Sequence, residues 1–315
     1  MITEVINLGS GSKGNAYFLN IKRKLDYGFS DDDLSETFGL LIECGLPFDT
    51  LSRRLREQSN GKFSMVNVKA VLVTHRHYDH SLAVKELLDV GKTVYAPISV
   101  FEYHEIDVDS TNYKGLAIPV KEMVKKYIAP KITITPFPLE HDEKKNMLYS
   151  KQKLLSKEDD YDETNGIVVY GYIIEIAKEY NILFFIDTMF MPFNLNNTGL
   201  KFNMIFGEAN HFHQSTYMAY RNALENKNYA NIKRYERIIF SHMSVETFIK
   251  TLNGIDLSKC ERIFVMHTSS SNRVTGDEIK YYQHIKRFIK PYHHKDLQIL
   301  VCKEQGNFVT GGILK

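Results

Sequence analysis

The feature that most constrains this 315-residue chain is a cluster of metal-binding residue types within six positions: His75, His77, Asp79 and His80. An apolar run at 70–73, typical of a buried strand, precedes the cluster, and helical spacing at 81–88 follows it. We therefore expect the cluster in a strand-to-helix loop. Three imidazoles and a carboxylate are unfavourable to crowd together unless a cation lies between them. A histidine-rich surface turn is the alternative, but the apolar run directly before the cluster favours a metal centre.

The order of the four residues suggests two metal ions. Alternate residues of an extended loop point the same way, so His75 and His77 can share one ion while Asp79 and His80 face another. Imidazole nitrogen and carboxylate oxygen favour Zn2+, with Mn2+ or Fe2+ as alternatives, over calcium and magnesium. The predicted cofactors are therefore two divalent metal ions.

Short apolar runs alternate with helical patterns along the chain, without an internal repeat or a long linker, so we predict one α+β domain over residues 1–315. The predicted strands lie near 6–8, 16–20, 40–43, 70–73, 94–95, 132–136, 168–176, 182–186, 204–206, 237–240 and 262–266. The predicted helices lie at 49–58, 81–88, 215–225, 245–252 and 277–288. Two polar segments, 22–36 and 142–165, are predicted surface insertions; the second is either a lid or a tolerated loop.

Composition excludes several classes of protein. The cysteines Cys44, Cys260 and Cys302 are scattered, so neither a disulfide framework nor a thiolate zinc site is expected. The N-terminus lacks the features of a signal peptide, and no apolar run approaches the ~18 residues that span a bilayer. We expect a cytoplasmic protein with no membrane partner.

The formal net charge of +2 neither requires nor excludes a polyanionic partner. A basic stretch near the C-terminus is either a solvated helix face or a surface that contacts phosphate: Lys280, Lys286, Arg287, Lys290, His293, His294 and Lys295.

Further motifs resemble the metallo-β-lactamase superfamily. They are the Gly-Ser loop at 7–16, which is similar to that of the YycJ-like (WalJ-type) branch, and the segments 41–45, 137–142, 185–188 and 263–267. Glu43 stands where the family usually has an aspartate. The resemblance implies a four-layer αβ/βα sandwich with the site at one edge of its two sheets. It implies that one metal is held by His75, His77 and His141, the other by Asp79, His80 and His267, with Asp187 between them.

Two more segments resemble the nuclease-like branches, in which a glutamate and a histidine pair to protonate the leaving oxygen. By that resemblance, Glu208 orients His242 as general acid, and Asp79 is the third catalytic residue. A buried histidine at a helix entry is the alternative for His242. The residues expected to line the substrate pocket are Asn15, Asn210, His211 and Asn272.

The predicted activity is therefore that of a phosphodiesterase, and specifically of a nuclease that cleaves DNA or RNA by metal-bound hydroxide. A phosphodiesterase of small or cyclic nucleotides would use the same site, and a lactonase- or thioesterase-type hydrolase is a second alternative. A non-catalytic binding module is a third, although such a module would be expected to lose ligands. The expected partner is a nucleic acid or nucleotide substrate, with a homodimer possible.

Overall fold

The first half of the chain forms a six-stranded sheet in the order β1-β2-β3-β4-β5-β6. Its strands are β1 (Ile2–Gly9), β2 (Ala16–Lys24), β3 (Ser35–Ile42), β4 (Val68–Leu72), β5 (Thr93–Ala96) and β6 (Ala117–Pro119). The pairs β1–β2 and β2–β3 are antiparallel, whereas β3 to β6 are parallel. Parallel strands need crossover connections. Helices supply them: α1 (Phe48–Gln58), α2 (Tyr78–Ser81), α3 (Val84–Asp89) and α4 (Ile98–Tyr103), with the 3-10 turn η1 (Met65–Asn67) before β4.

The second half forms an eight-stranded sheet in the order β14-β13-β12-β11-β10-β9-β8-β7. Its strands are β7 (Lys126–Ala129), β8 (Ile132–Leu139), β9 (Val169–Ile176), β10 (Tyr180–Phe185), β11 (Met204–Glu208), β12 (Arg262–Met266), β13 (Gln298–Cys302) and β14 (Phe308–Val309). Strands β10 to β13 are parallel. The connections contain η3 (Leu195–Thr198), α6 (His213–Glu225), α7 (Tyr229–Ser241), α8 (Val245–Asn253) and α9 (Asp277–Phe288).

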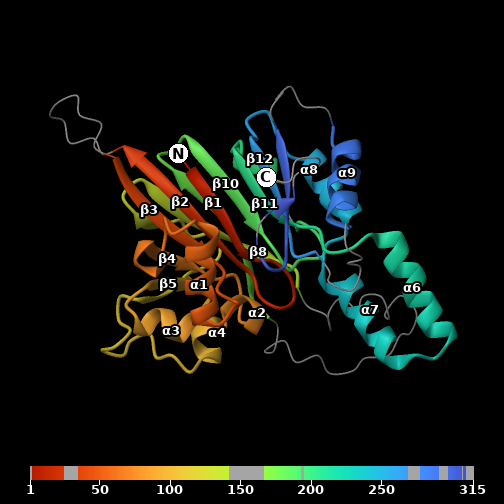
Figure 1. Ribbon diagram of the computed structural model, residues 1–315, viewed down its shortest axis with the longest axis horizontal. Coiled ribbons are helices and arrows are strands. Elements are labelled where there is room, and N and C mark those ends of the chain that lie inside the picture. The colour runs from red at the N-terminus through yellow and green to blue at the C-terminus, as the bar shows by residue number, and fades with distance from the viewer. Residues whose placement is uncertain are drawn as a thin grey trace.

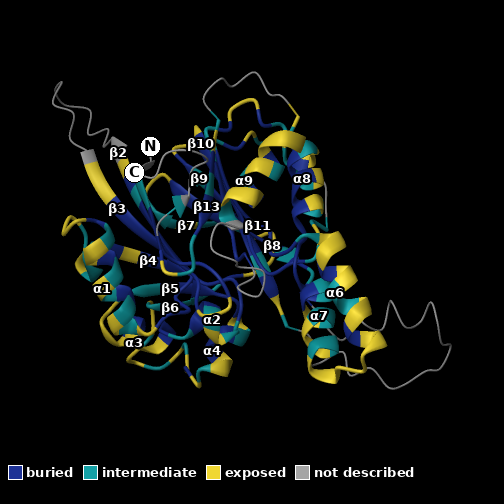
Figure 2. Ribbon diagram, turned by 45° about the vertical axis from the view of Figure 1, so that its right-hand side comes forward, coloured by how far each residue is buried: buried dark blue, intermediate teal, exposed yellow. Residues whose placement is uncertain are grey.

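The two sheets pack face to face, with helices on both outer faces, in the computed structural model (Figure 1). The structure describes residues 2–24, 35–141, 167–192, 195–268, 277–290, 297–306 and 308–309. Side chains alternate across each strand, so Tyr172 lies in the core between the sheets and Ile173 lies under the helices of the second sheet. Leu51 of α1 and Phe248 of α8 fill the two outer apolar layers. Figure 2 shows these buried layers in dark blue, and the architecture confirms the predicted four-layer αβ/βα sandwich.

One predicted strand is wrong. Residues 237–240 form the end of α7, although Ile238, Ile239 and Phe240 resemble a strand in composition. The helix begins much earlier, because the Asn228 side chain accepts a hydrogen bond from the Asn231 backbone N–H and caps it. The predicted helix at 81–88 also begins earlier, at Tyr78, and is divided into α2 and α3.

The first predicted insertion is partly a hairpin, because Lys24 of β2 pairs with Ser35 of β3. Residues 25–34 and 142–166 lie outside the described residues, and with them the predicted lid. Within the part of the chain that the structure describes, no helix combines the length and apolar character needed to cross a membrane.

Candidate metal centre

The ends of several strands bring the predicted ligands to one edge of the sandwich. His75 and His77 follow β4, and Asp79 and His80 lie in α2, directly after them. The others follow strands of the second sheet: His141 after β8, Asp187 after β10 and His267 after β12. These three strands run in the same direction, so their carboxyl ends lie at the same edge. All seven predicted ligands therefore lie in the described part of the structure and converge.

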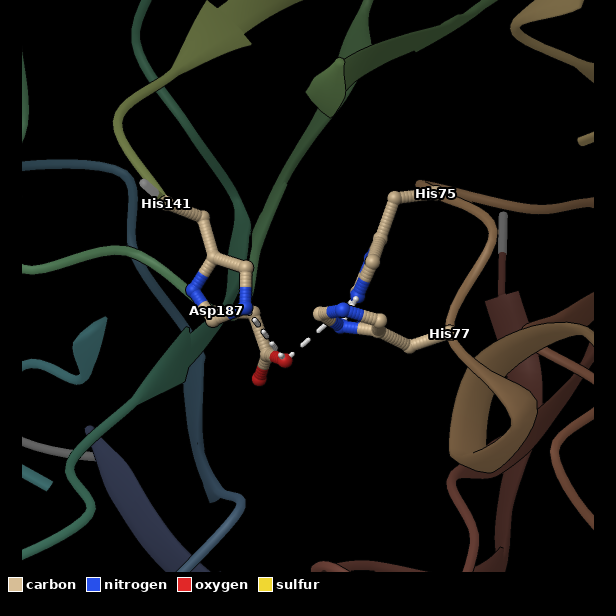
Figure 3. Close-up of side chains that lie close together, drawn as sticks. All are labelled: His75, His77, His141 and Asp187. Carbon is tan, nitrogen blue, oxygen red and sulfur yellow. Dashed lines mark hydrogen bonds and ion pairs between the residues drawn. The ribbon is translucent and has the colours of Figure 1, made fainter. Parts of the chain in front are cut away.

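His75, His77, His141 and Asp187 form the first group, and their donor atoms all lie within 4.8 Å of one another. Figure 3 shows the two histidines of the first half facing His141 and Asp187 of the second. Asp187 Oδ2 lies 3.6 Å from His75 Nε2 and 3.7 Å from His141 Nε2. The Nδ1 atoms of His75 and His141, which are the ring nitrogens farther from Asp187, have partners of their own. The Thr74 hydroxyl lies 2.9 Å from His75 Nδ1, and His141 Nδ1 donates to the Ser241 carbonyl at 3.0 Å. Such partners fix the direction of a metal-binding imidazole.

The second group contains Asp79, His80 and His267. His80 Nε2 lies 3.4 Å from Asp79 Oδ2 and 3.3 Å from Asp187 Oδ2, and His267 Nε2 lies 3.7 Å from Asp79 Oδ2. Because the same Asp187 oxygen approaches His75, His141 and His80, this carboxylate lies between the two groups, which is the place that the family resemblance implies for it.

Two observations show that these residues fit divalent cations. Asp187 Oδ1 and His267 Nε2 are buried without a hydrogen-bond partner in the described structure, which is costly unless another ligand satisfies them. The donors are imidazole nitrogens and carboxylate oxygens, the set that zinc, manganese and iron prefer. The second group contains two histidines and one carboxylate, which is the set of three protein ligands found in zinc sites that leave one coordination position open.

The charges of the two groups differ. Burial, together with the neighbouring His80, keeps the pKa of His75 well below its usual range, so this imidazole is neutral and ready to bind a cation. Burial also opposes charge on His267, but Asp187, Asp79 and Glu208 raise the pKa of His267 to about 10. Burial would raise the pKa of Asp187, but His267 and His80 hold it well below its usual range. Asp187 is therefore ionised, and the positive charge that stabilises it comes from His267 and His80, at the place where a divalent cation could lie.

Glu208 and His242 form a hydrogen-bonded pair beside this centre. His242 Nδ1 lies 2.7 Å from Glu208 Oε1, and Glu208 Oε2 accepts the Thr188 backbone N–H at 3.0 Å. Glu208 is fully buried, whereas 9% of His242 is exposed. His242 Nδ1 is 3.8 Å from Asp187 Oδ1, so these residues with His267 could also hold an ion. The short bond to Glu208 occupies Nδ1 and favours the predicted pairing.

The backbone is strained at three positions of the site. Glu43, Asp187 and His267 have φ values of 63°, 50° and 51°, in the left-handed region that non-glycine residues rarely adopt. Each costs of order 1–3 kcal/mol and persists only where the surroundings enforce it. Asp187 and His267 both follow the end of a strand, so the strain turns their side chains into the centre.

Glu43 is a supporting residue whose partner the sequence could not identify. It is fully buried, its Oε1 lies 3.5 Å from His80 Nδ1, and its Oε2 accepts the Thr74 backbone N–H at 3.4 Å. Burial raises the pKa of Glu43, while His80 lowers it. One signal in the sequence could have indicated this role. Glu43 is a charged residue directly after the apolar run 40–42, and a carboxylate buried at such a place needs a partner.

The predicted substrate-binding residues occupy other positions. The Asn15 amide is buried against the Asp79 carbonyl, 3.2 Å away, and Asn210 Nδ2 donates to the His267 carbonyl at 2.8 Å. His211 is also buried. These side chains support the ligand-bearing loops and do not face solvent, so their burial disfavours direct contact with substrate. Asn272 lies outside the described residues.

Of the two residues between the ligands of this loop, Tyr78 is exposed and Arg76 is half-buried. Tyr78, between His77 and Asp79, is 59% exposed and packs edge-on against Tyr103 of α4, with ring centroids 5.3 Å apart. The Arg76 guanidinium lies 6.0 Å from the Tyr103 ring centroid. These side chains form an aromatic and basic rim on the first half of the molecule.

Comparisons with known proteins give a matching family and several proteins with a similar fold. The family described as "Beta-lactamase superfamily domain" matches residues 40–268. The fold is similar to that of the metallo-beta-lactamase fold protein YhfI from Bacillus subtilis, at 13% identity and a TM-score of 0.59, covering 97% of this chain and 98% of that one. It is also similar to Zn(2+)-bound PqqB from Methylobacterium extorquens, at 12% identity and a TM-score of 0.55, covering 97% and 99%.

A long form RNase Z from yeast is similar at 12% identity and a TM-score of 0.54, covering 98% of this chain but 41% of that one. This chain therefore spans less than half of the yeast protein. At these identities the likeness shows the fold alone. Among proteins with curated descriptions, none matches the sequence.

Proposed function

The chain belongs to the beta-lactamase superfamily, whose members are metal-dependent hydrolases, and from this we propose that it is a dinuclear phosphodiesterase that acts as a nuclease. The Glu208–His242 pair carries the proposal. A phosphodiester releases an alkoxide, which leaves poorly unless it is protonated, whereas a strained lactam or a thioester has less need of an acid. The likeness of the fold to RNase Z and the sequence resemblance of the Glu208 and His242 segments to the nuclease-like branches support the same activity.

In this proposal His75, His77 and His141 would hold one divalent ion, and Asp79, His80 and His267 the other, with Asp187 shared. When bound, the ions would supply Lewis-acid polarisation of the phosphoryl group and an acidified water as nucleophile. Zn2+ fits these donors, and Mn2+ or Fe2+ fit them as alternatives.

The chain's own residues supply the proton. The Glu208 carboxylate accepts from His242 Nδ1 at 2.7 Å and so fixes the ring, which leaves Nε2 to carry the transferable proton. As the bond from phosphorus to the water oxygen forms and the ester bond breaks, His242 protonates the departing oxygen. Glu208 is itself held by the Thr188 backbone N–H, so the pair is positioned before substrate binds.

The dependence of His242→Ala on the leaving group tests this role. With a dinucleotide, whose leaving oxygen is an alkoxide, we expect kcat/KM to fall about 10²–10⁴-fold. With bis(p-nitrophenyl) phosphate, whose leaving group needs no acid, the fall should be under about tenfold. His213→Ala is the matched control, since His213 is exposed at the start of α6, and metal content is measured for each protein.

An equal loss on both substrates, or loss of bound metal, would remove His242 from the acid role. Wild-type protein that contains two metals but cleaves neither phosphodiester would contradict the proposed function and favour a lactone or thioester substrate. Turnover of dinucleotides and cyclic nucleotides but not of longer strands would favour the small-nucleotide alternative.

A further inference from the structure

Helices α6 and α7 form an antiparallel hairpin, residues 213–241, that projects from the second half of the molecule (Figure 1). The chain segments before α6 and after α7 are hydrogen-bonded to each other beside the candidate site. His211 and Ser244 form a β-bridge, the Asn210 backbone N–H donates to the Met243 carbonyl at 2.8 Å, and the Val245 N–H donates to the His211 carbonyl at 2.8 Å. The hairpin therefore begins just after Glu208 and ends directly before His242, and its base is fixed to the proposed acid.

Most of the hairpin faces solvent. Only Thr216, Ala223, Ile238 and Ser241 are buried within it, and Figure 2 shows the outer surface of α6 as largely exposed. Exposed apolar and aromatic side chains include Met218, which is 60% exposed, and Tyr229, which is 72% exposed. Each helix has 13 residues and is therefore about 20 Å long. A projection that buries so little of its own surface contributes little to the core.

The net positive charge of the chain comes from the hairpin. It has five basic side chains against the acidic Glu225 and Glu236, a net charge of +3, whereas the whole chain has +2, so the remainder has −1. All five basic residues are exposed: Arg221, Lys227, Lys233, Arg234 and Arg237. Arg221 pairs with Glu225 at 3.7 Å, and Glu236 accepts the Tyr220 hydroxyl at 3.0 Å. The three basic residues of α7 form no ion pair with any carboxylate in the described part of the chain.

We propose that this α6–α7 hairpin is a docking arm for the phosphate backbone of a polynucleotide whose scissile bond lies at the metal centre. The inference rests on the proposed function and narrows it to nucleic acid. Unpaired basic residues gain from phosphates by releasing condensed counterions, and exposed tyrosines offer faces on which bases stack. At 3.4 Å per nucleotide of a duplex strand, the arm reaches past about six phosphates, whereas a small cyclic nucleotide would not reach it.

The test neutralises the arm with Lys233→Gln, Arg234→Gln and Arg237→Gln together. The matched control is Lys85→Gln, Lys114→Gln and Lys121→Gln, three exposed residues of the first half, which removes the same charge. Fluorescence anisotropy of the holoenzyme with a labelled phosphorothioate strand, which keeps its charge and resists hydrolysis, gives Kd between roughly 50 and 200 mM salt. The ratio of polynucleotide to dinucleotide kcat/KM is measured in parallel.

We expect the arm variant to weaken binding roughly 10- to 50-fold near 150 mM salt and to reduce the slope of log Kd against log salt by about 2, since each phosphate contact contributes about 0.7. The kcat/KM ratio should fall by a similar factor, and the control variant should change neither quantity more than about twofold.

Equal effects in both variants, or an unchanged salt slope in the arm variant, would overturn the proposal. Loss of a dimer in sedimentation velocity, with unchanged binding, would overturn it in favour of a contact between copies of the chain. Arm-dependent binding by a wild-type protein that cleaves no phosphodiester would support the docking arm and contradict only the proposed activity.

Discussion

Gly45→Ala should disable one metal group and leave the other intact. Gly45 lies where the segment after β3 packs on the backbone of the ligand loop: the Cys44 N–H donates to the His80 carbonyl at 2.8 Å, and the Gly45 N–H donates to the Asn15 carbonyl at 3.0 Å. A Cβ atom at Gly45 would lie 2.5 Å from the His80 nitrogen and closer still to the Asp79 carbonyl, whereas ordinary contacts are 3.4–4 Å. The Asp79–His80 backbone must therefore move by about 1 Å or more.

Metal–ligand distances in proteins vary by only ~0.2 Å, so the site cannot keep its geometry after a displacement of this size. The group formed by Asp79, His80 and His267 should lose its ion, while His75, His77 and His141 keep theirs. Overpacking of this kind costs about 1–3 kcal/mol, which lowers Tm by a few degrees in a domain of this size. We expect the metal content to fall from about two ions per chain to about one, and phosphodiesterase activity to fall at least about 100-fold.

Metal analysis after dialysis, thermal unfolding and turnover of bis(p-nitrophenyl) phosphate measure these effects. Gly254→Ala is the control, because a Cβ there would lie 3.4 Å from the nearest atom, the Thr251 carbonyl oxygen, and needs no displacement. A folded Gly45→Ala protein that retains two ions with wild-type affinity would refute the reasoning, since the loop would then have moved without cost to the ligands.

Three further changes probe the same centre. Glu208→Gln should lower kcat on a dinucleotide about 100-fold with little change in KM. The amide can still accept the Thr188 N–H, but it is no longer a charged acceptor that fixes the His242 ring. A loss of kcat under threefold would contradict the pairing. Glu43→Gln should weaken the ion beside His80 about 10–100-fold in a chelator competition, and unchanged affinity would remove Glu43 from the supporting role. Chelation of both ions should lower Tm by roughly 5–15 °C, since each ion at 100 times its Kd adds about 2.7 kcal/mol to the free energy of unfolding; an unchanged Tm would contradict a structural contribution of the metals.

Most of the secondary structure could be predicted from local patterns. The runs that became β4, β10 and β12 are continuous and apolar because both faces of each strand are buried, and that pattern is visible without a structure. The last turn of α7 was misread as a strand because Ile238 to Phe240 are apolar in succession. These residues are helical because the helix is capped ten residues before Ile238, at Asn228, and because α7 packs against α6.

The sequence by itself determined which residues could bind metal and which would follow strands. His75, His77, Asp79 and His80 are four donor residues within six positions, and spacing of that kind is a local property. His141, Asp187 and His267 are single residues after apolar runs. Their strands end at one edge because β10 and β12 are joined by parallel pairing through β11, and because β8 is antiparallel to β9, which is antiparallel to β10.

Only the tertiary structure decided what each polar residue does there. The separation of 31 positions between Glu43 and Thr74 carries no distance information in the sequence. The pairing of Glu208 with His242, 34 positions apart, was expected only from the family resemblance, and the structure gives its distance. Burial likewise comes from packing: Asn15 and Asn210 look like pocket residues, yet they satisfy backbone groups behind the ligands because those groups are shut off from water. The projection of the basic hairpin from the site was also decided in three dimensions, because charge along a chain does not say which surface it reaches.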